Sequence, residues 1–571
     1  MGGRDKSGRG HAKEDLNPMG VYAMGYGVAS AATCVPQGRS GRVCGGRRRD
    51  VDGGRRPGRK GRVSQARVVT PVVARAGDVA TDTGQKALRL NLDNTLYGTF
   101  AEIGAGQEVS RWFFRVGGAA GTVAKAVSAY DMTISDTLYG ACDRYVTRER
   151  LESMLDYEFL QVQLPLNKDR GEDTRFFAFA NTLVAQSYMG NRECHGWIGL
   201  KFQHEPKAKP STLLMHIRML DATAQLQQEA VGVLGVNLLN ACFYLRDDVK
   251  AMLGSLSDGL GGKGAWEAGE KRIEVDLADL DGPAFAGGNG EVNRMAALHL
   301  ITTGLTDAAF FSSDGKVLLP SDELRKKHIL VHRGVLRPPS KLDVEMLRAG
   351  AEQMLCSLDG ESEEGRCVLP SESVSCLEMM MDPADEHDEA GFLDRVDMGN
   401  KLGYPVFVTR FFFYFSLVGY FARFSRQAHV LTMGIPGLKS LFDEAYYDKL
   451  EGGVLEAFGR LLKFDTKIYV YPDLKQGSGG EVETVENVEL ASPVTQKLFE
   501  YLREKGAIVP ISSYKQEMLS EGNVPKDLRD AISAGDASKW KALVPEALHE
   551  AVQEKYSGKP YEHKQQRALD I

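Results

Sequence analysis

Hydrophobic positions along the chain follow both the helix and the strand period. Residues 148–164 carry their apolar side chains on one helical stripe, and residues 225–245 are nearly all apolar, so both ranges predict helices. Shorter alternating or continuously apolar runs predict strands at residues 88–92, 174–181, 196–203, 212–219 and 272–277. Strands that alternate with helices predict an α/β or α+β fold, with mixed sheet layers and long helices.

Helices are expected to become more frequent toward the C-terminus. Strands are predicted at residues 327–332 and 467–471, and helices at 439–451, 455–464 and 495–505. The most apolar run, residues 411–421, is shorter than the ~20 apolar residues that a membrane-spanning helix requires. It therefore predicts a buried helix, and we expect no integral membrane insertion.

These patterns predict four parts. They are a leader at residues 1–80, an α/β N-terminal domain at 84–285, a second α/β segment with acidic loops at 286–397, and a mostly helical C-terminal region at 398–571. The acidic loops, at residues 360–365 and 383–389, contain the Pro and Gly residues typical of surface turns.

The leader differs from the rest of the chain in charge. Residues 1–80 contain 16 Lys and Arg against 6 Asp and Glu, whereas the whole chain has a net charge of −7. A segment rich in Arg and Gly with almost no aromatic residues is expected to be disordered. It resembles a chloroplast transit peptide, with residues 72–76 similar to a stromal processing site. A mitochondrial leader or a basic tail is the alternative.

The remaining chain is acidic, and its cysteines are scattered. Residues 81–571 carry a net charge of −17, which disfavours binding to nucleic-acid phosphates. None of the six cysteines after the leader belongs to a Cys-x-x-Cys pair. This spacing predicts reduced thiols and no metal site. We therefore expect a soluble protein of the plastid stroma.

Three short motifs overlap near the start of the folded sequence. Residues 91–97 are similar to the opening motif of haloacid-dehalogenase-type phosphatases, but Asn91 stands where that chemistry needs an aspartate nucleophile. Gly104-Ala105-Gly106 provides the first two glycines of a dinucleotide-binding turn, with the bulky Val109 at the third small position. An ordinary strand–loop–helix connection is the structural alternative.

The third motif, residues 98–107, is similar to the GTFxxIHxGH loop of mononucleotide adenylyltransferases. In that family two histidines hold the triphosphate of ATP, and here Gly104 and Gln107 occupy their positions. Ile511-Ser512-Ser513-Tyr514 is similar to the family's ISSTxxR segment, without its arginine. The resemblance implies ATP and magnesium as cofactors. It implies a binding site made of Gly98, Thr99, Phe100, Gly104, Gly106, Ser512 and Ser513.

A second candidate site, a pocket, comprises Cys194, His195, His216 and Arg218 on two neighbouring predicted strands. Cys194 and His195 are adjacent in sequence, but neighbours on a strand point to opposite faces, so adjacency does not predict a catalytic dyad. Buried, hydrogen-bonded core residues are the alternative. Residues 333–338 can likewise present two guanidiniums to an anion or form an exposed turn.

Long phrases of the chain resemble one family of bacterial and plastid proteins. These phrases are residues 96–109, 128–132, 177–182, 194–197, 216–221 and 450–453. Members are named nicotinate or nicotinamide mononucleotide adenylyltransferases, or TonB-dependent receptors. The second name implies a membrane barrel of about ten-residue amphipathic strands, which the long predicted helices argue against.

Two functions therefore remain open. The resemblance implies a nucleotide-handling enzyme that joins a mononucleotide to ATP and releases pyrophosphate, with residues 98–106 as its phosphate loop. The alternative is a non-catalytic binding or scaffold protein of the plastid, in which the same glycines serve backbone geometry alone. The sequence identifies no catalytic residue, and a small-molecule nucleotide is the partner that it suggests.

Overall fold

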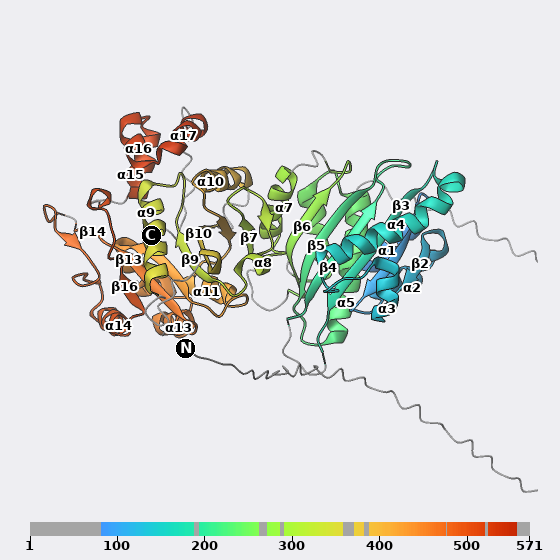
Figure 1. Cartoon of the computed structure of the whole chain (residues 1–571), viewed down its shortest axis with the longest axis horizontal. Helices are drawn as coiled ribbons and strands as arrows, with labels where there is room; N and C mark the ends of the chain where they lie inside the picture. The colour runs from blue at the N-terminus through green and yellow to red at the C-terminus, as the bar shows by residue number, and fades with distance from the viewer. Residues whose placement is uncertain are drawn as a thin grey trace, which may run out of the picture. The chain divides into compact units, whose positions relative to one another are not determined.

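The computed structural model describes residues 82–187, 193–261, 271–285, 290–357, 370–381, 388–475, 477–519 and 524–556. The predicted leader, the acidic loop at 360–365 and most of the loop at 383–389 lie outside these ranges. The described residues form two large β-sheets, each with helices packed on both faces, and a separate two-stranded sheet (Figure 1). The predicted α/β or α+β class with mixed sheets is thereby confirmed.

The first sheet has six strands of mixed direction. In sheet order these are β2 (Val123–Val127), β1 (Leu96–Ile103), β3 (Arg175–Val184), β4 (His195–Phe202), β5 (Ser211–Met219) and β6 (Ile273–Asp281). β1 is parallel to β2 and β3, and the other neighbours are antiparallel. The four strands predicted between residues 174 and 277 are confirmed as β3 to β6.

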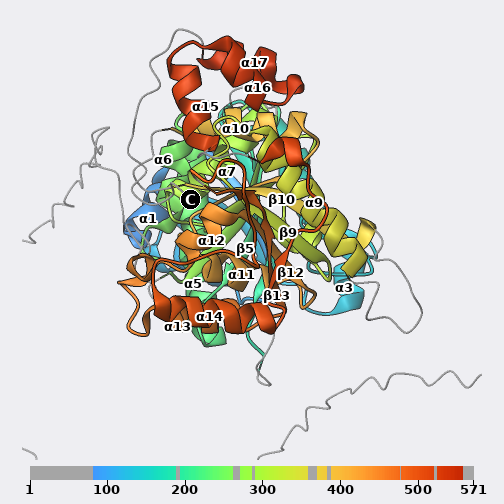
Figure 2. The ribbon, with the colours of Figure 1, turned by 90° about the vertical axis from the view of Figure 1, so that its left-hand side faces the viewer.

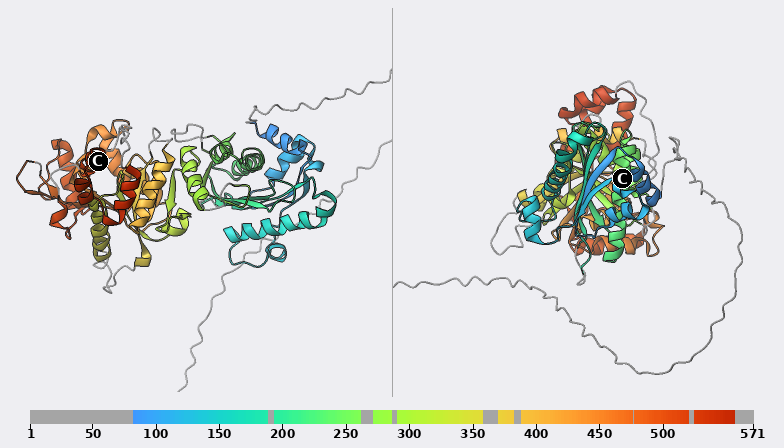
Figure 3. Two further views of the ribbon diagram at one scale, coloured as in Figure 1. Left: turned by 90° about the horizontal axis from the view of Figure 1, so that it is seen from above. Right: turned by 90° about the vertical axis from the view of Figure 1, so that its right-hand side faces the viewer.

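Helices cover both faces of this sheet. They are α1 (Thr83–Leu92), α2 (Glu108–Val116), α3 (Met132–Tyr139), α4 (Arg148–Arg170), α5 (Ala224–Tyr244), α6 (Val249–Gly254) and α7 (Gly290–Thr302). α1, α2 and α5 enclose one core with Phe100 and Phe179, and α4 packs over Ala101 and Ala178 on the opposite face (Figure 3). Successive strand residues thus enter different cores, which explains the continuously apolar strand sequences.

The second sheet has eight strands. In sheet order these are β16 (Ile508–Pro510), β13 (Thr466–Tyr471), β12 (His429–Gly434), β9 (His328–Arg333), β10 (Ser373–Met380), β11 (Val406–Thr409), β7 (Ala308–Phe311) and β8 (Val317–Leu318). The first six are mutually parallel. Along the chain, strands are added on one side of β9 up to β11 and then on its other side from β12 onward. Ranges 286–397 and 398–571 therefore contribute strands to one sheet.

Two helical layers enclose the second sheet. Its helices are α8 (Pro320–Leu324), α9 (Lys341–Ser357), α10 (Glu389–Lys401), α11 (Tyr414–Phe421), α12 (Ile435–Leu441), α13 (Gly453–Leu461) and α14 (Pro493–Glu504). α9 and α10 pack on one face, and α11 to α14 pack on the other. The short strands β14 (Asp473–Leu474) and β15 (Val482–Glu483) pair separately.

The last three helices form a small core of their own. α15 (Val524–Ser533), α16 (Ala537–Leu543) and α17 (His549–Tyr556) surround Trp540 and contact Met398 of α10 (Figure 2). The predicted buried helix at residues 411–421 is present as α11, which begins three residues later than expected. No described helix combines the length and the apolar composition that crossing a lipid bilayer demands.

The predicted strand at residues 88–92 is wrong, because this segment is the last half of helix α1. Asp82 caps the helix by accepting a hydrogen bond from the N–H of Gln85 at 2.9 Å. Ala87 and Leu90 are buried at helical spacing, whereas Leu88 and Leu92 are 38% and 67% exposed. The alternation of leucines arises from exposed apolar residues and does not reflect a strand.

The buried imidazole of His429 makes the fold sensitive to acid. His429 lies between Phe421 and Phe464, and neither ring nitrogen has a hydrogen-bond partner among the described residues. Burial lowers the pKa of His429 to about 4. The unfolded chain, with a histidine pKa of about 6.5, therefore takes up a proton that the folded protein does not.

We predict that the free energy of unfolding falls as pH decreases from about 6.5 to about 4, by an amount on the order of 3 kcal/mol from His429 alone. His429→Leu removes the titrating group and should flatten this dependence. Urea denaturation of both proteins at several pH values measures it. Identical pH dependence in the two proteins would contradict the assignment.

Candidate functional site

Gly98, Thr99 and Phe100 lie inside a buried strand. β1 has a hydrogen-bonded neighbour on each side, and the N–H of Gly98 donates to the carbonyl of Thr122 at 2.9 Å. A Cβ atom at Gly98 would lie 2.3 Å from the carbonyl oxygen of Phe177. Glycine is needed here because β3 approaches closely. The three residues are thus part of the sheet and do not form the predicted loop.

Gly104 and Gly106 do lie in the loop that follows β1, and both adopt positive φ angles, of 99° and 72°. Their N–H groups donate to the hydroxyl of Tyr130 at 3.3 and 3.4 Å. The second and third amides of α2, at Val109 and Ser110, donate to the carboxylate of Glu102 at 3.1 and 2.9 Å. The Glu102 carboxylate therefore lies at the N-terminus of α2, in the place where a bound phosphate would otherwise accept these hydrogen bonds.

Ser512 and Ser513 belong to the other sheet, where they follow β16. The N–H and the hydroxyl of Ser512 donate to Oε1 of Gln353 on α9, at 3.0 and 3.3 Å. The two halves of the predicted nucleotide site therefore lie on different sheets.

Asn91, at the proposed phosphatase position, has a structural role. Its amide group donates to the carbonyls of Phe113 and Gly117, both at 2.8 Å, at the C-terminal end of α2. Asn91 is buried, so these bonds satisfy carbonyls that the helix itself leaves unpaired. An amide can donate both bonds, and a carboxylate cannot.

We predict that Asn91→Asp lowers the free energy of unfolding by about 2–4 kcal/mol, because a carboxylate would face two carbonyl oxygens. The variant should hydrolyse no phosphate ester. Asn94→Asp, at an exposed position three residues later, is the matched control and should leave stability nearly unchanged. Thermal denaturation measures both effects. Equal melting temperatures for the two variants would show that the amide is not a helix cap.

His195, His216 and Arg218 come together on one face of the first sheet. His195 pairs with Arg218 across β4 and β5, and Trp197 pairs with His216. Cys194 points to the opposite face, as expected for a strand, and its thiol donates to Oε1 of Gln186 at 3.0 Å. Three of the four residues of the predicted pocket therefore form a cluster, and the fourth belongs to the core beneath α5.

The cluster is organised by Asp276, a residue that the sequence analysis missed. Its Oδ2 accepts from Nδ1 of His216 at 2.9 Å and from Nε of Arg218 at 2.6 Å. The other ring nitrogen of His216 lies 3.0 Å from Nδ1 of His195. We name the chain His195–His216–Asp276 the histidine relay. Glu193 forms a further ion pair with Arg218.

A bulge in β6 places Asp276 in this position. Val275 pairs with Ile217 and Leu277 pairs with His216, so Asp276 is an extra residue between them. Bulges of this kind redirect a side chain and are frequent next to active sites. Acidic residues alternate with apolar ones in residues 272–277, and this pattern was the only sequence signal for a polar site on the strand. It does not reveal the strand pairing that brings Asp276 to His216.

Burial by itself raises the pKa of Asp276, but hydrogen bonds from His216 and the charge of Arg218 outweigh burial and hold that pKa below its usual value. Burial also lowers the pKa of His195, with a smaller contribution from the nearby His216. The relay thus joins an ionised carboxylate to a neutral imidazole at neutral pH. Such perturbed groups are typical of functional sites.

A crevice lies where the strand order of the second sheet reverses, between β9 and β12. Its walls are residues 332–340 after β9, 433–437 after β12 and 471–473 after β13, together with one side of α15. Its apolar lining comes from Leu336, Leu342, Met346, Tyr414, Met433 and Tyr471. The enclosed space is about 100 Å³, comparable to the ~150 Å³ cavity that can hold a benzene ring.

Three arginines lie at or near the crevice. Arg333 is buried and donates to both carboxylate oxygens of Glu378, at 2.5 and 3.1 Å. It therefore does not present its guanidinium to an anion together with Arg337, as one of the two sequence alternatives for residues 333–338 required. Arg337 forms an ion pair with Asp388, and Arg529 lies on the α15 side of the crevice. Asp343 accepts from His332 at 2.9 Å and lies beside the apolar lining.

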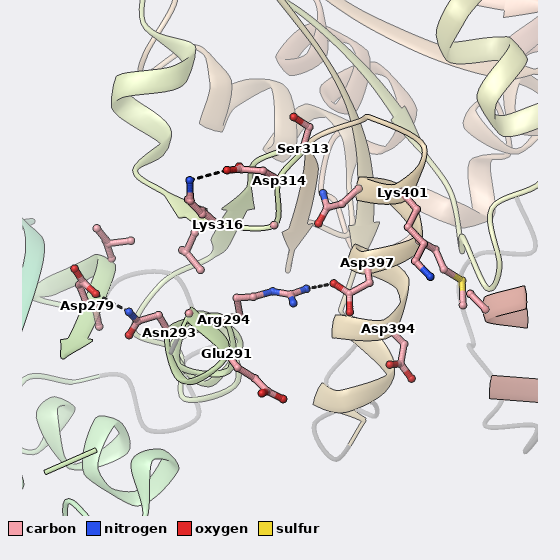
Figure 4. A pocket seen from close by; sticks show the side chains of 18 of the residues that line it. Asp279, Glu291, Asn293, Arg294, Ser313, Asp314, Lys316, Asp394, Asp397 and Lys401 are labelled. Carbon is pink, nitrogen blue, oxygen red and sulfur yellow. Dashed lines mark hydrogen bonds and ion pairs between the residues drawn. The ribbon is translucent and has the colours of Figure 1, made fainter. Parts of the chain in front are cut away.

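A second cavity, of about 800 Å³, lies between β6, α7, the β7–β8 turn, α10 and α17 (Figure 4). Its charged residues are largely paired with one another. Arg294 pairs with Asp397, and Lys316 pairs with Asp314 at 2.7 Å. Both cations and anions line the wall, so the lining does not select a ligand of one charge. None of the residues predicted from the sequence lines it.

Metal ligands do not cluster in the described part of the chain, where no group of three or more His, Cys, Asp or Glu residues is arranged to hold a metal ion.

Comparison with known proteins yields distant structural likenesses. No family model matches the chain, and no curated protein matches it. The competence/damage-inducible protein CihA of Agrobacterium tumefaciens is 16% identical over 28% of this chain and 96% of its own, with a TM-score of 0.21. A competence or damage-inducible protein of Enterobacter asburiae is 12% identical over 29% and 99%, with a TM-score of 0.21. A CinA-superfamily protein of Escherichia coli is 10% identical over 28% and 93%, also at 0.21. Values this low identify no function.

Proposed function

We propose that this protein binds a nucleotide in the crevice between β9 and β12. The observation that supports the proposal is that the crevice coincides with the point where the strand order reverses. The order β11-β10-β9-β12-β13-β16 is the 3-2-1-4-5-6 order of dinucleotide-binding sheets, and ligands of such sheets bind outside the carboxyl ends of the strands at this point.

The lining of the crevice fits one part of a nucleotide in particular. Its apolar and aromatic walls suit a planar base, and the enclosed space is too small for a whole nucleotide. The sugar and phosphates would then extend toward Arg337 and Arg529, whose guanidiniums can donate paired hydrogen bonds to phosphate oxygens. The ligand class follows from this combination of an apolar slot and basic residues beside it.

Gly434 provides a test, because it stands at the wall of the crevice in extended backbone, with φ −84° and ψ 175°. A Cβ atom there would lie 3.5 Å from Cδ of Pro436 and 3.9 Å from Sδ of Met346, which are ordinary contacts. Gly434→Ala should therefore fold normally and leave the crevice open. Gly434→Phe should extend a ring into it.

We predict that wild type and Gly434→Ala bind at least one of ATP, NAD and nicotinate mononucleotide, and that Gly434→Phe binds it more than about tenfold more weakly, equivalent to ~1.4 kcal/mol. Isothermal titration calorimetry measures the dissociation constants, and circular dichroism checks the fold of each variant. Absence of binding to wild type by all three nucleotides, or equal binding by both variants, would refute the proposal.

We favour a protein that binds a nucleotide in the crevice and does not catalyse adenylyl transfer at residues 98–106. The amides of Gly104 and Gly106 are paired with Tyr130, and the amides of Val109 and Ser110 in α2 are paired with Glu102. The two positions at which adenylyltransferases use histidine are Gly104 and Gln107. Incubation with ATP, magnesium and nicotinate mononucleotide should release no pyrophosphate. Turnover that depends on Gly104 would restore the catalytic alternative.

We further propose that the protein acts in the plastid stroma, which the basic, acid-poor composition of residues 1–80 supports. In an import assay, isolated chloroplasts should convert the radiolabelled chain to a protease-protected product cut near residues 72–76, and isolated mitochondria should not. Import into mitochondria alone would favour the other organelle.

A further inference from the structure

The histidine relay connects a partly exposed imidazole to a buried carboxylate. His216 and Asp276 are buried, whereas the ring of His195 is partly exposed. The two links of the relay measure 3.0 and 2.9 Å, within the range of normal hydrogen bonds. No hydrogen bond to Nε2 of His195 is formed by any residue in the described ranges.

The hydrogen-bond pattern assigns the ring protons. An ionised Asp276 can only accept, so Nδ1 of His216 carries a proton and donates it. When His216 carries only this proton, its Nε2 is an acceptor, and Nδ1 of His195 carries the proton that lies between the two rings. Nε2 of His195 is left with its lone pair directed away from the relay.

We propose that Nε2 of His195 is a general base, which takes a proton from a hydroxyl group or a water molecule of a small-molecule substrate bound at this face of the first sheet. His216 and Asp276 act as positioning residues, because they fix the tautomer of His195 and do not touch the substrate. The site is separate from the crevice of the second sheet, so it neither requires nor excludes nucleotide binding there.

Proton transfer through the relay is balanced. The substrate oxygen gives its proton to Nε2 of His195 and keeps the electron pair of the O–H bond. The proton on Nδ1 of His195 can then pass to Nε2 of His216. The positive charge thereby moves to His216, next to the carboxylate of Asp276. A buried anion that stabilises an imidazolium in this way orients and strengthens a histidine base.

Other charges face the relay from several elements. The guanidinium of Arg144 and the carboxylate of Asp322 act electrostatically on His195 with opposite signs. Both Arg218 and His216 donate to the carboxylate of Asp276, and Arg218 also forms an ion pair with Glu193. The positive charge of Arg218 is therefore balanced by Glu193 as well as by Asp276. Arg144 is exposed and can attract an anionic substrate toward His195.

Buried polar atoms near Asp276 include a hydroxyl from the second half of the chain. The hydroxyl of Tyr420 on α11, Oδ1 of Asp276 and Oε1 of Glu274 are buried, and none of them has a hydrogen-bond partner among the described residues. Tyr420 lies close enough to both carboxylates for their charges to raise its pKa, although burial is the larger cause.

The test uses the whole folded protein with ¹⁵N-labelled histidine. Long-range ¹H–¹⁵N correlation spectra show which ring nitrogen carries the proton, and comparison with His195→Gln assigns the signals. At pH 7 we expect His195 to be neutral and protonated at Nδ1. A proton on Nε2, or an imidazolium at pH 7, would overturn the proposal, and this measurement depends on wild type alone.

Diethyl pyrocarbonate probes the lone pair directly. Nε2 attacks the carbonyl carbon, ethyl carbonate leaves as carbon dioxide and ethanol, and the Nδ1 proton is lost. We expect His195 to react at pH 7, and peptide mass spectrometry measures the rate of its modification. His216→Phe should slow this reaction by about tenfold, because His195 loses the hydrogen bond that fixes its tautomer. His204→Gln, two residues after the end of β4, should leave the rate unchanged. Equal rates in wild type and His216→Phe would refute the relay.

Discussion

Parallel strands cannot be joined by a tight turn, and this constraint shapes the second half of the molecule. Each connection between its six parallel strands must cross the sheet, and helices provide the crossings. They bury both faces, which is why β9, β12 and β13 consist almost entirely of buried residues. Because the chain first builds to one side of β9 and later to the other, two connections diverge there, and a crevice remains between them.

The first sheet contains both parallel and antiparallel strands, and the pairing of its antiparallel strands creates the histidine relay. Only β1, β2 and β3 are parallel, and the antiparallel strands that follow place β4, β5 and β6 side by side. Direct pairing across these strands brings two histidines and an arginine together, and one bulge adds Asp276. Arg218 also lies against the ring of Phe424, and Glu274 pairs with Arg423 at 3.1 Å, so the second half contributes to the same environment. Buried charges of this kind cost desolvation energy unless they are well paired.

Unpaired backbone amides explain why glycine-rich resemblances can mislead. The loop at Gly104 and Gly106 and the start of α2 present amide donors that must be satisfied whatever the protein does. In a phosphate-binding loop a ligand satisfies them. Here Tyr130 and Glu102 do so from within the chain. The letters of a motif specify backbone conformation, and only the surrounding side chains decide what the amides bind.

The sequence by itself determined the α/β class, the helices α4, α5, α11, α13 and α14, and the four strands β3 to β6, because local periodicity records which side of each element is buried. It failed at residues 88–92, where exposed leucines produced a strand-like alternation in a helix. It also failed at residues 439–451, where α12 ends at Leu441 and only a short 3-10 helix, Glu444–Tyr447, follows. Tertiary structure alone decided the strand order, and with it the crevice and the partner of His216. Asp276 is 60 residues from His216 along the chain, and Gly98 and Ser512 lie on different sheets. Pairing between distant strands depends on the energy of the whole assembly, which no local pattern encodes.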